Sequence, residues 1–297
     1  TKPAYLCEIA FHDNAIDTAL ERNPKFRAVI SRALTKGASD YFKAGTPYAP
    51  VAPNYVRAEN QSQGEVTVSW RDGADPTEAN AVPLAYRVYL STNGRGFDTG
   101  WLTSEKHLTF AGLSSSQVYY FAVAAVNAGG ESPKSSVVPV RVGSATRLIV
   151  DGFDRFDERI NPQERRQTFN HAIRHAEALA AIGSEAFDGC QNEAVEGSDL
   201  SLSPYQLVDW VLGEESTVDE TFSAAEQAAV APASETFKIG NFEYQYVEKS
   251  KKPEVRSSTS GASEVGLQVK VEPPEVGLRS ESLVVENQSA GSVVKAS

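Results

Sequence analysis

The chain has 297 residues, of which 41% are hydrophobic and 9% aromatic, so it can form packed cores and is not disordered throughout. Its formal net charge of −11 argues against a nucleic-acid partner, because such partners bind basic surfaces. The two cysteines, Cys7 and Cys190, exclude a disulfide-dense scaffold and a four-cysteine zinc site.

The acidity belongs to one region. Between Ser184 and Glu235 there are 12 acidic residues and no Lys or Arg, and the remainder of the chain has a net charge of +1. No apolar run approaches the roughly 18 residues of a membrane-spanning helix, so no transmembrane segment is expected.

Residues 1–44 combine a predicted strand with a predicted helix. The mostly apolar run 4–11 is typical of a buried strand. Asn23-Pro24 indicates a helix start, because Asn caps free N–H groups and Pro suits the first helical position. The apolar face that follows at helical spacing must pack on something. Since the chain also contains no Met, we interpret 1–44 as the end of a domain whose beginning is absent.

A series of short alternating runs follows a proline-rich linker at 45–53. Val66–Trp70 and Tyr86–Leu90 alternate between apolar and polar residues, and further short runs extend to Val142. Turn residues separate these runs, which predicts an antiparallel sandwich.

Residues 53–143 resemble the fibronectin type III domain. The resemblance rests on Trp70 at the end of one strand, on Tyr86-x-Val-Tyr89, and on Leu113 with Tyr119 six positions later. It implies a tyrosine corner, in which the Tyr119 hydroxyl is tied to the preceding loop backbone. The module serves as spacer, adhesin or enzyme accessory alike, so it indicates a fold and little about function.

Strands and helices alternate from residue 146 onward. Runs at 147–153 and 207–213 predict core strands, and a helix ends at Gly183. Ser223 and Glu226 have the spacing of a capping box at another helix start. This order favours a parallel sheet in a partial α/β domain at 146–248. Its segments 187–195 and 205–217 resemble class I glutamine amidotransferases in shape. We expect 249–297 to be a mostly disordered or weakly stranded tail.

Glu8 is the principal catalytic candidate. Glu8, Phe11 and Asn14 resemble the C-terminal end of zinc-dependent N-acetylmuramoyl-L-alanine amidases, which cleave the bond between peptidoglycan sugar and stem peptide. The resemblance implies that Glu8 is the acid/base and that two His and one Glu upstream of Thr1 bind zinc. Zinc lowers the pKa of bound water to about 7, and a nearby carboxylate can then carry the proton to the leaving amine. Alternatively, Glu8 is a strand-end carboxylate paired with an arginine at 22, 27 or 32.

Three other groups of residues are candidate sites. His171 and His175 have a metal-compatible spacing, but the intervening residues lack a carboxylate, which favours solvated helix histidines. Cys190 as an amidotransferase-type nucleophile would need a His partner after it, and none follows, so a buried structural thiol is favoured.

The acidic residues flanking 207–213 lack the spacing of a calcium loop, so a solvated acidic rim is favoured. These residues are Asp209, Glu214, Glu215, Asp219 and Glu220.

The sequence therefore predicts a multidomain chain. Its central all-β fibronectin type III sandwich is flanked by a partial α/β amidase remnant and by a partial α/β domain with a disordered tail. The predicted function is a fragment of an exported bacterial peptidoglycan hydrolase, extracellular or periplasmic, that cleaves the muramoyl–alanine bond with zinc-activated water. This chain alone is expected to bind no zinc and to be inactive. The alternative is a non-enzymatic envelope or secreted protein that binds glycan or protein, with the sandwich as spacer or adhesion module.

Overall fold

The structure is a computed structural model that describes ten stretches of the chain. They are residues 6–42, 44–61, 64–75, 77–153, 171–212, 222–230, 236–239, 242–245, 283–287 and 292–296.

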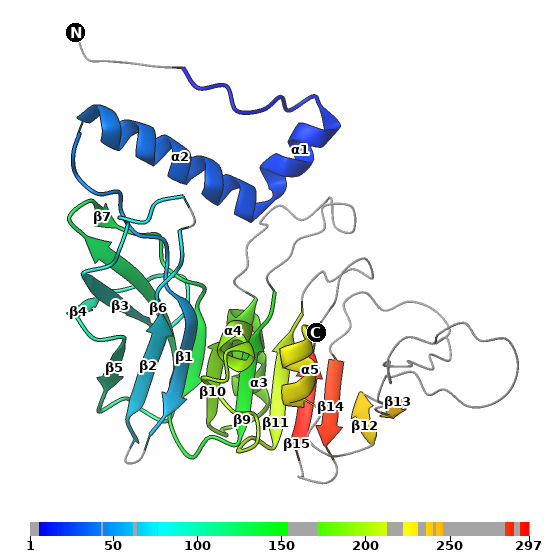
Figure 1. Cartoon of the computed structure of the whole chain (residues 1–297). Helices are drawn as coiled ribbons and strands as arrows, with labels where there is room; N and C mark the ends of the chain where they lie inside the picture. The colour runs from blue at the N-terminus through cyan, green and yellow to red at the C-terminus, as the bar shows by residue number, and fades with distance from the viewer. Residues whose placement is uncertain are drawn as a thin grey trace, which may run out of the picture.

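Two facing antiparallel sheets form the sandwich (Figure 1). One sheet contains β1 (Asn54–Asn60), β2 (Val66–Arg71) and β5 (His107–Phe110). The other contains β4 (Trp101–Thr103), β3 (Ala85–Ser91), β6 (Val118–Asn127) and β8 (Val138–Arg141), with the short β7 (Gly130–Glu131) beside β6.

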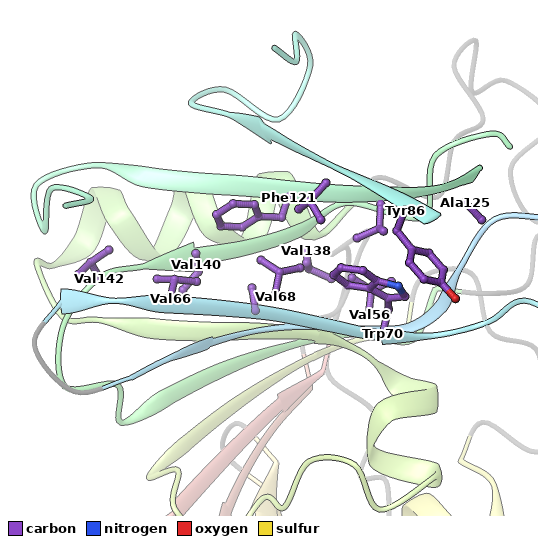
Figure 2. Close-up of a cluster of buried hydrophobic side chains, with 13 residues drawn as sticks. Val56, Val66, Val68, Trp70, Tyr86, Phe121, Ala125, Val138, Val140 and Val142 are labelled. Atoms are coloured by element: carbon purple, nitrogen blue, oxygen red, sulfur yellow. The ribbon is translucent and has the colours of Figure 1, made fainter. Parts of the chain in front are cut away.

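The sandwich core lies between these sheets (Figure 2). Alternate residues of β2 are buried, as the apolar/polar alternation predicts. The rings of Trp70 and Tyr86 meet edge to face, with centroids 5.3 Å apart. The tyrosine corner is confirmed, because the Ser114 N–H donates to the Tyr119 hydroxyl at 2.9 Å. The sequence therefore predicted the alternation of β2 and the tyrosine corner, but not β1, which contributes Val56 and Ala58 to this core.

A second set of elements continues the sheet beyond the sandwich. It contains β9 (Arg147–Asp151), α3 (Ala172–Ile182), β10 (Phe187–Gln191), α4 (Asn192–Glu196), β11 (Leu207–Val211) and α5 (Ala224–Val230), which we call the β9–α5 unit. Its strands are parallel, in the order β11-β9-β10. Ile149 packs on the α3 side, whereas Leu148 and Val150 belong to the cluster that includes α4 and α5. Both faces are covered, which explains why the strands are apolar throughout.

Strand β10 joins the unit to the sandwich. It pairs antiparallel with β8 of one sheet, at Phe187↔Arg141, and with β1 of the other, at Ala58↔Gly189. The two edge strands of the sandwich are thus covered by one strand. A Cβ at Gly189 would lie 2.1 Å from the Pro139 carbonyl oxygen, so this close approach requires glycine.

Four further strands extend the far side of the sheet. They are β12 (Thr236–Ile239), β13 (Phe242–Gln245), β14 (Leu283–Asn287) and β15 (Ser292–Ala296). Strand β15 lies parallel to β11, and β14 and β12 follow in antiparallel order. We expected 249–297 to be mostly disordered or weakly stranded, and within this tail 283–287 and 292–296 form strands. The rest of 249–297 lies outside the described residues.

The N-terminal stretch consists of α1 (Ala15–Arg22) and α2 (Pro24–Phe42), preceded by an irregular segment. The predicted strand at 4–11 is wrong for the described residues 6–11, which have no strand partner and are largely exposed. Strands need a neighbour to satisfy their backbone groups, whatever their side-chain pattern. Helix α2 contacts the sandwich through polar groups, since Arg32 pairs with Asp75. Its apolar residues Val29 and Phe42 remain exposed.

Candidate functional site

Glu8 lies in an exposed irregular segment. The motif around it has a defined local structure, because the Asn14 side-chain oxygen accepts from the Ile16 N–H at 2.9 Å and caps α1. The Phe11 N–H donates to Asp17 Oδ2 at 3.0 Å. Arg32 belongs to the Asp75 ion pair, so it does not support the alternative pairing with Glu8.

The described residues do not fit the zinc that the amidase resemblance implies. Among them, no group of three or more His, Cys, Asp or Glu side chains could hold a metal ion. No hydrolytic step is therefore assigned to Glu8 in this chain. Within the same ranges, none of the helices combines the length and apolarity that crossing a bilayer requires, as expected from the sequence.

A cavity of about 540 Å³ lies where the sandwich meets the β9–α5 unit, and we call it the junction cavity. The carboxyl ends of the parallel strands β9 and β10 form one wall, which is where open α/β sheets usually bind ligands. The lining residues are Val51–Tyr55, Asp72–Ala74 and Lys134–Ser136 from the sandwich, and Asp151, Phe153 and Gln191–Glu193 from the unit.

A β-bulge shapes the sandwich wall of the junction cavity. The β1–β2 register shifts between Asn54 and Arg57, so Tyr55 and Val56 have no partner in β2. Tyr55 has a φ of 57°, a backbone conformation that non-glycine residues seldom adopt. Bulges and such backbone outliers gather at functional sites, where they redirect a side chain. Here the bulged residue Tyr55 lines the cavity.

Gln191 compensates for the missing ladder bond. Its Oε1 accepts from the Val56 N–H at 2.7 Å, and the residue is only 7% exposed. This bond fixes the orientation of the amide, because only its oxygen can accept. The Nε2 group is left without a hydrogen-bond partner among the described residues, on a side chain that lines the cavity.

Asn192 offers the complementary group. Its Nδ2 donates to Glu226 Oε1 at 2.9 Å, which leaves its Oδ1 without a donor in the described part of the chain. Glu226 also closes the predicted capping box, since its Oε2 accepts from the Ser223 N–H at 2.7 Å and Ser223 Oγ accepts from the Glu226 N–H. Burial raises the pKa of Glu226, and the hydrogen bonds from Asn192 and Ser223 partly offset it. A helix cap thus holds Asn192 in place.

The described residues of the cavity lining include three carboxylates, Asp72, Asp151 and Glu193, and one cation, Lys134. Asp72 accepts a hydrogen bond from Lys106 Nζ at 2.9 Å. Glu193 accepts from Asn54 Nδ2 at 3.1 Å, so it also links the unit to β1. Lys134 lies over the Tyr89 ring, 4.1 Å from its centroid.

The other sequence candidates have structural roles. His175 Nδ1 lies 2.9 Å from Asp209 Oδ2, beneath α3, so the expectations of a solvated histidine and of a solvated rim at Asp209 are both wrong. Asp209 is 5% exposed because it lies within β11, whose two faces are covered. His171 contacts the Phe153 ring edge to face. The acidic positions 214, 215, 219 and 220 lie outside the described residues.

Cys190 is a buried thiol of the apolar cluster beneath α4, as expected. Burial raises the pKa of this thiol well above its ordinary value, with smaller contributions from nearby carboxylates such as Glu59. A nucleophilic cysteine needs the opposite shift. The neighbouring Gln191 and Asn192 were missed as site residues. Their position after a core strand and before a helix was the available signal.

The sandwich and its tyrosine corner define a β-sandwich module of the immunoglobulin-like kind. More narrowly, residues 51–141 match the fibronectin type III domain, and this part of the chain is such a domain. No curated protein matches the chain.

Several solved structures are similar to part of the chain. They include domains A168–A170 of titin (23% identity, 30% of this chain and 30% of that chain, TM-score 0.27). An Fn3-like protein from Clostridium thermocellum shares 26% identity over 31% of this chain and 91% of that chain, with a TM-score of 0.26. The third fibronectin III domain of human KIAA0343 protein shares 23% identity over 33% of this chain and 86% of that chain, with a TM-score of 0.27. Each likeness is confined to about a third of this chain.

Proposed function

We propose that this chain is the non-catalytic arm of an exported bacterial peptidoglycan hydrolase of the N-acetylmuramoyl-L-alanine amidase type. It would act in the cell envelope, outside the cytoplasm. The proposal of an arm rests on strand β10, which pairs with the edge strands of both sandwich sheets. A fibronectin type III domain joined by a hinge could reorient, whereas a shared strand holds the sandwich and the β9–α5 unit as one body.

Buried polar contacts reinforce this joint. Asp188 is 5% exposed, and its Oδ1 accepts from both the backbone N–H and the Nδ2 of Asn60, each at 2.8 Å. Within the β9–α5 unit, its Oδ2 accepts from the Tyr205 hydroxyl at 2.7 Å, which helps to hold the carboxylate in place. Breaking a buried bond to a carboxylate costs more than breaking a neutral one, so the two parts resist separation.

The hydrolase part of the proposal is supported by the sequence motif around Glu8. Its zinc ligands would precede Thr1 in the parent protein. In that parent, Glu8→Gln is expected to lower kcat for muramoyl–alanine cleavage by about 10²–10⁴-fold, the usual contribution of a general acid/base. Glu105→Gln changes an exposed carboxylate on the sandwich and is expected to leave kcat unchanged. Equal kcat values for the two variants would show that Glu8 is not the acid/base.

The 297-residue chain itself tests the role of an arm. Incubated with insoluble peptidoglycan and zinc, it is expected to pellet with the polymer and to release no stem peptide. Release of stem peptide would contradict the assignment of a non-catalytic arm. Failure to pellet would contradict peptidoglycan binding.

The alternative is an envelope or secreted binding protein without hydrolase activity. The observation that favours it is that Glu8 is exposed and that the described residues include no group of three or more His, Cys, Asp or Glu side chains able to hold a metal ion. The parent protein decides between the two, because only a hydrolase releases stem peptide from peptidoglycan.

A further inference from the structure

We propose that helix α2 is held on the sandwich by a salt-sensitive polar latch centred on Asp75, which opens while the sandwich stays folded. Helix α2 lies across one end of the sandwich (Figure 1). The latch joins Arg32 and Lys36 of α2 to Asp75, Thr77 and Glu78 in the loop after β2. It sets where α1 and the irregular segment before it lie relative to the sandwich.

Asp75 is the centre of the latch. Its side chain is 7% exposed, and its Oδ2 accepts from Arg32 Nε at 2.8 Å and also from Arg32 Nη2. Its Oδ1 accepts from the Thr77 N–H at 2.9 Å and from the Thr77 hydroxyl at 2.8 Å. Burial by itself raises the pKa of Asp75, but the bonds from Thr77 and Arg32 outweigh it and hold that pKa well below its ordinary value. The carboxylate therefore stays charged and faces the arginine.

Arg32 and Lys36 reach the sandwich from the same side of α2. They are four residues apart, so their side chains are neighbours on the helix surface. Arg32 Nη1 also donates to the Ala49 backbone oxygen at 3.0 Å. Lys36 Nζ donates to Glu78 Oε1 at 2.9 Å and lies 3.7 Å from Asp75 Oδ2. Two cations of one helix thus meet two carboxylates of one loop.

Helix α2 adds no buried side chain to the sandwich. None of its residues 26–42 is buried, and Val29, Tyr41 and Phe42 are 64%, 69% and 66% exposed. Helices in proteins are held mainly by burying an apolar face, so α2 depends on its polar contacts instead. The buried residues of the sandwich core lie within 56–142. Release of α2 therefore leaves this core complete.

The charged groups of the latch remain in contact with solvent. The side chains of Arg32 and Glu78 are each 24% exposed, and that of Lys36 is 21% exposed. Salt weakens such pairs, because the Debye length shortens from about 10 Å at 0.1 M to about 3 Å at 1 M ionic strength. Ionic strength is therefore the condition that opens the latch.

Two spin labels on the 297-residue chain measure the position of α2. Ala33→Cys places one label at an exposed position of α2, and Ala111→Cys places the other at an exposed position after β5. Cys7→Ser removes the exposed native thiol, and Cys190 is buried. A single narrow distance distribution is expected at about 0.1 M salt, and its narrow component is expected to shrink at about 1 M. A broad distribution at low salt, or a narrow component that salt leaves unchanged, would overturn the proposal.

Two variants test the latch from its two sides at low salt. Asp75→Asn removes the charge that faces the helix, and Arg32→Gln removes its partner without changing the sandwich. Both are expected to lose the narrow component, whereas Glu105→Gln, at an exposed carboxylate outside the latch, is expected to keep it. An Arg32 variant that keeps the narrow component would overturn the proposal, even if the Asp75 variant fails to fold.

Near-ultraviolet circular dichroism of the same samples shows whether the sandwich remains folded. The signal of its packed aromatic side chains, which include Trp70 and Tyr86, is expected to be unchanged in the Arg32 variant. Loss of this signal together with release of α2 would contradict a latch that opens alone. Neither measurement involves peptidoglycan or zinc, so their outcome is independent of the proposed function.

Discussion

Gly189→Ala probes the joint between the sandwich and the β9–α5 unit. The added Cβ would lie 2.1 Å from the Pro139 carbonyl oxygen and 2.8 Å from Pro139 Cδ, closer than real Cβ atoms approach other atoms. The nearest atom belongs to the backbone of β8, so it cannot move aside as a flexible side chain would. Overpacking of this kind typically costs about 1–3 kcal/mol.

The same displacement would also strain the hydrogen bonds on either side. Asp188 accepts two bonds from Asn60, and Gln191 accepts one from Val56. A buried bond contributes about 0.5–1.5 kcal/mol, so the loss of stability is expected at the upper end of the overpacking range, at about 2–3 kcal/mol.

Urea unfolding of the 297-residue chain measures this loss. Gly96→Ala is the matched control, because its new Cβ would have Asn93 Oδ1 as its nearest neighbour at an ordinary 3.9 Å. Unfolding free energies of the Gly189 and Gly96 variants that agree within about 0.5 kcal/mol would refute the close approach of β10 to β8.

Three further outcomes test the described contacts. Tyr119→Phe removes the acceptor of the Ser114 N–H and is expected to lower the unfolding free energy by about 1 kcal/mol in urea melts; an unchanged value would deny the tyrosine corner a role. Ser223→Ala removes one half of the capping box and is expected to cost about 0.5–2 kcal/mol, which thermal melts can check against an Ala128→Ser control on the sandwich surface. Burial, with a bond to Glu131, raises the pKa of Tyr89 to about 12, and burial raises that of Tyr120 to about 12. Both raised values favour the neutral phenol in the folded state, so their stabilisation is complete below about pH 10 and is lost as the pH rises towards 12. Tyrosine absorbance recorded during alkaline unfolding checks this, and ionisation of every tyrosine near pH 10 in the folded chain would contradict it.

The sandwich was predictable because its information is local. Alternation placed Val66, Val68 and Trp70 on one face, and the spacing of Leu113 and Tyr119 indicated the corner that Ser114 completes. The capping box of α5 was predictable for the same reason, since both partners lie within one turn. Where two interacting groups are close in sequence, the sequence pattern predicts their contact in the structure.

The N-terminal stretch shows where pattern alone misleads. The run at 4–11 has the composition of a buried strand, yet its described residues pair with nothing, and Phe11 is 63% exposed. A hydrophobic composition shows that a segment could be buried, but burial also requires a neighbouring surface for it to pack on. Asp209 shows the converse, because an apparently solvated carboxylate is buried against His175 by a helix that begins more than 30 residues earlier.

The sequence by itself determined the alternating strands of the sandwich, its tyrosine corner, the start of α2 and the capping box of α5, because each depends on residues a few positions apart. Only the tertiary structure decided the junction cavity. That site needs β10 beside β1, across more than 130 residues of chain, so that Gln191 meets the N–H left free by the bulge at Tyr55 and Val56. No local sequence pattern predicts such a pairing, because an edge strand can pair with many strands. Which strand it pairs with depends on how the rest of the chain packs.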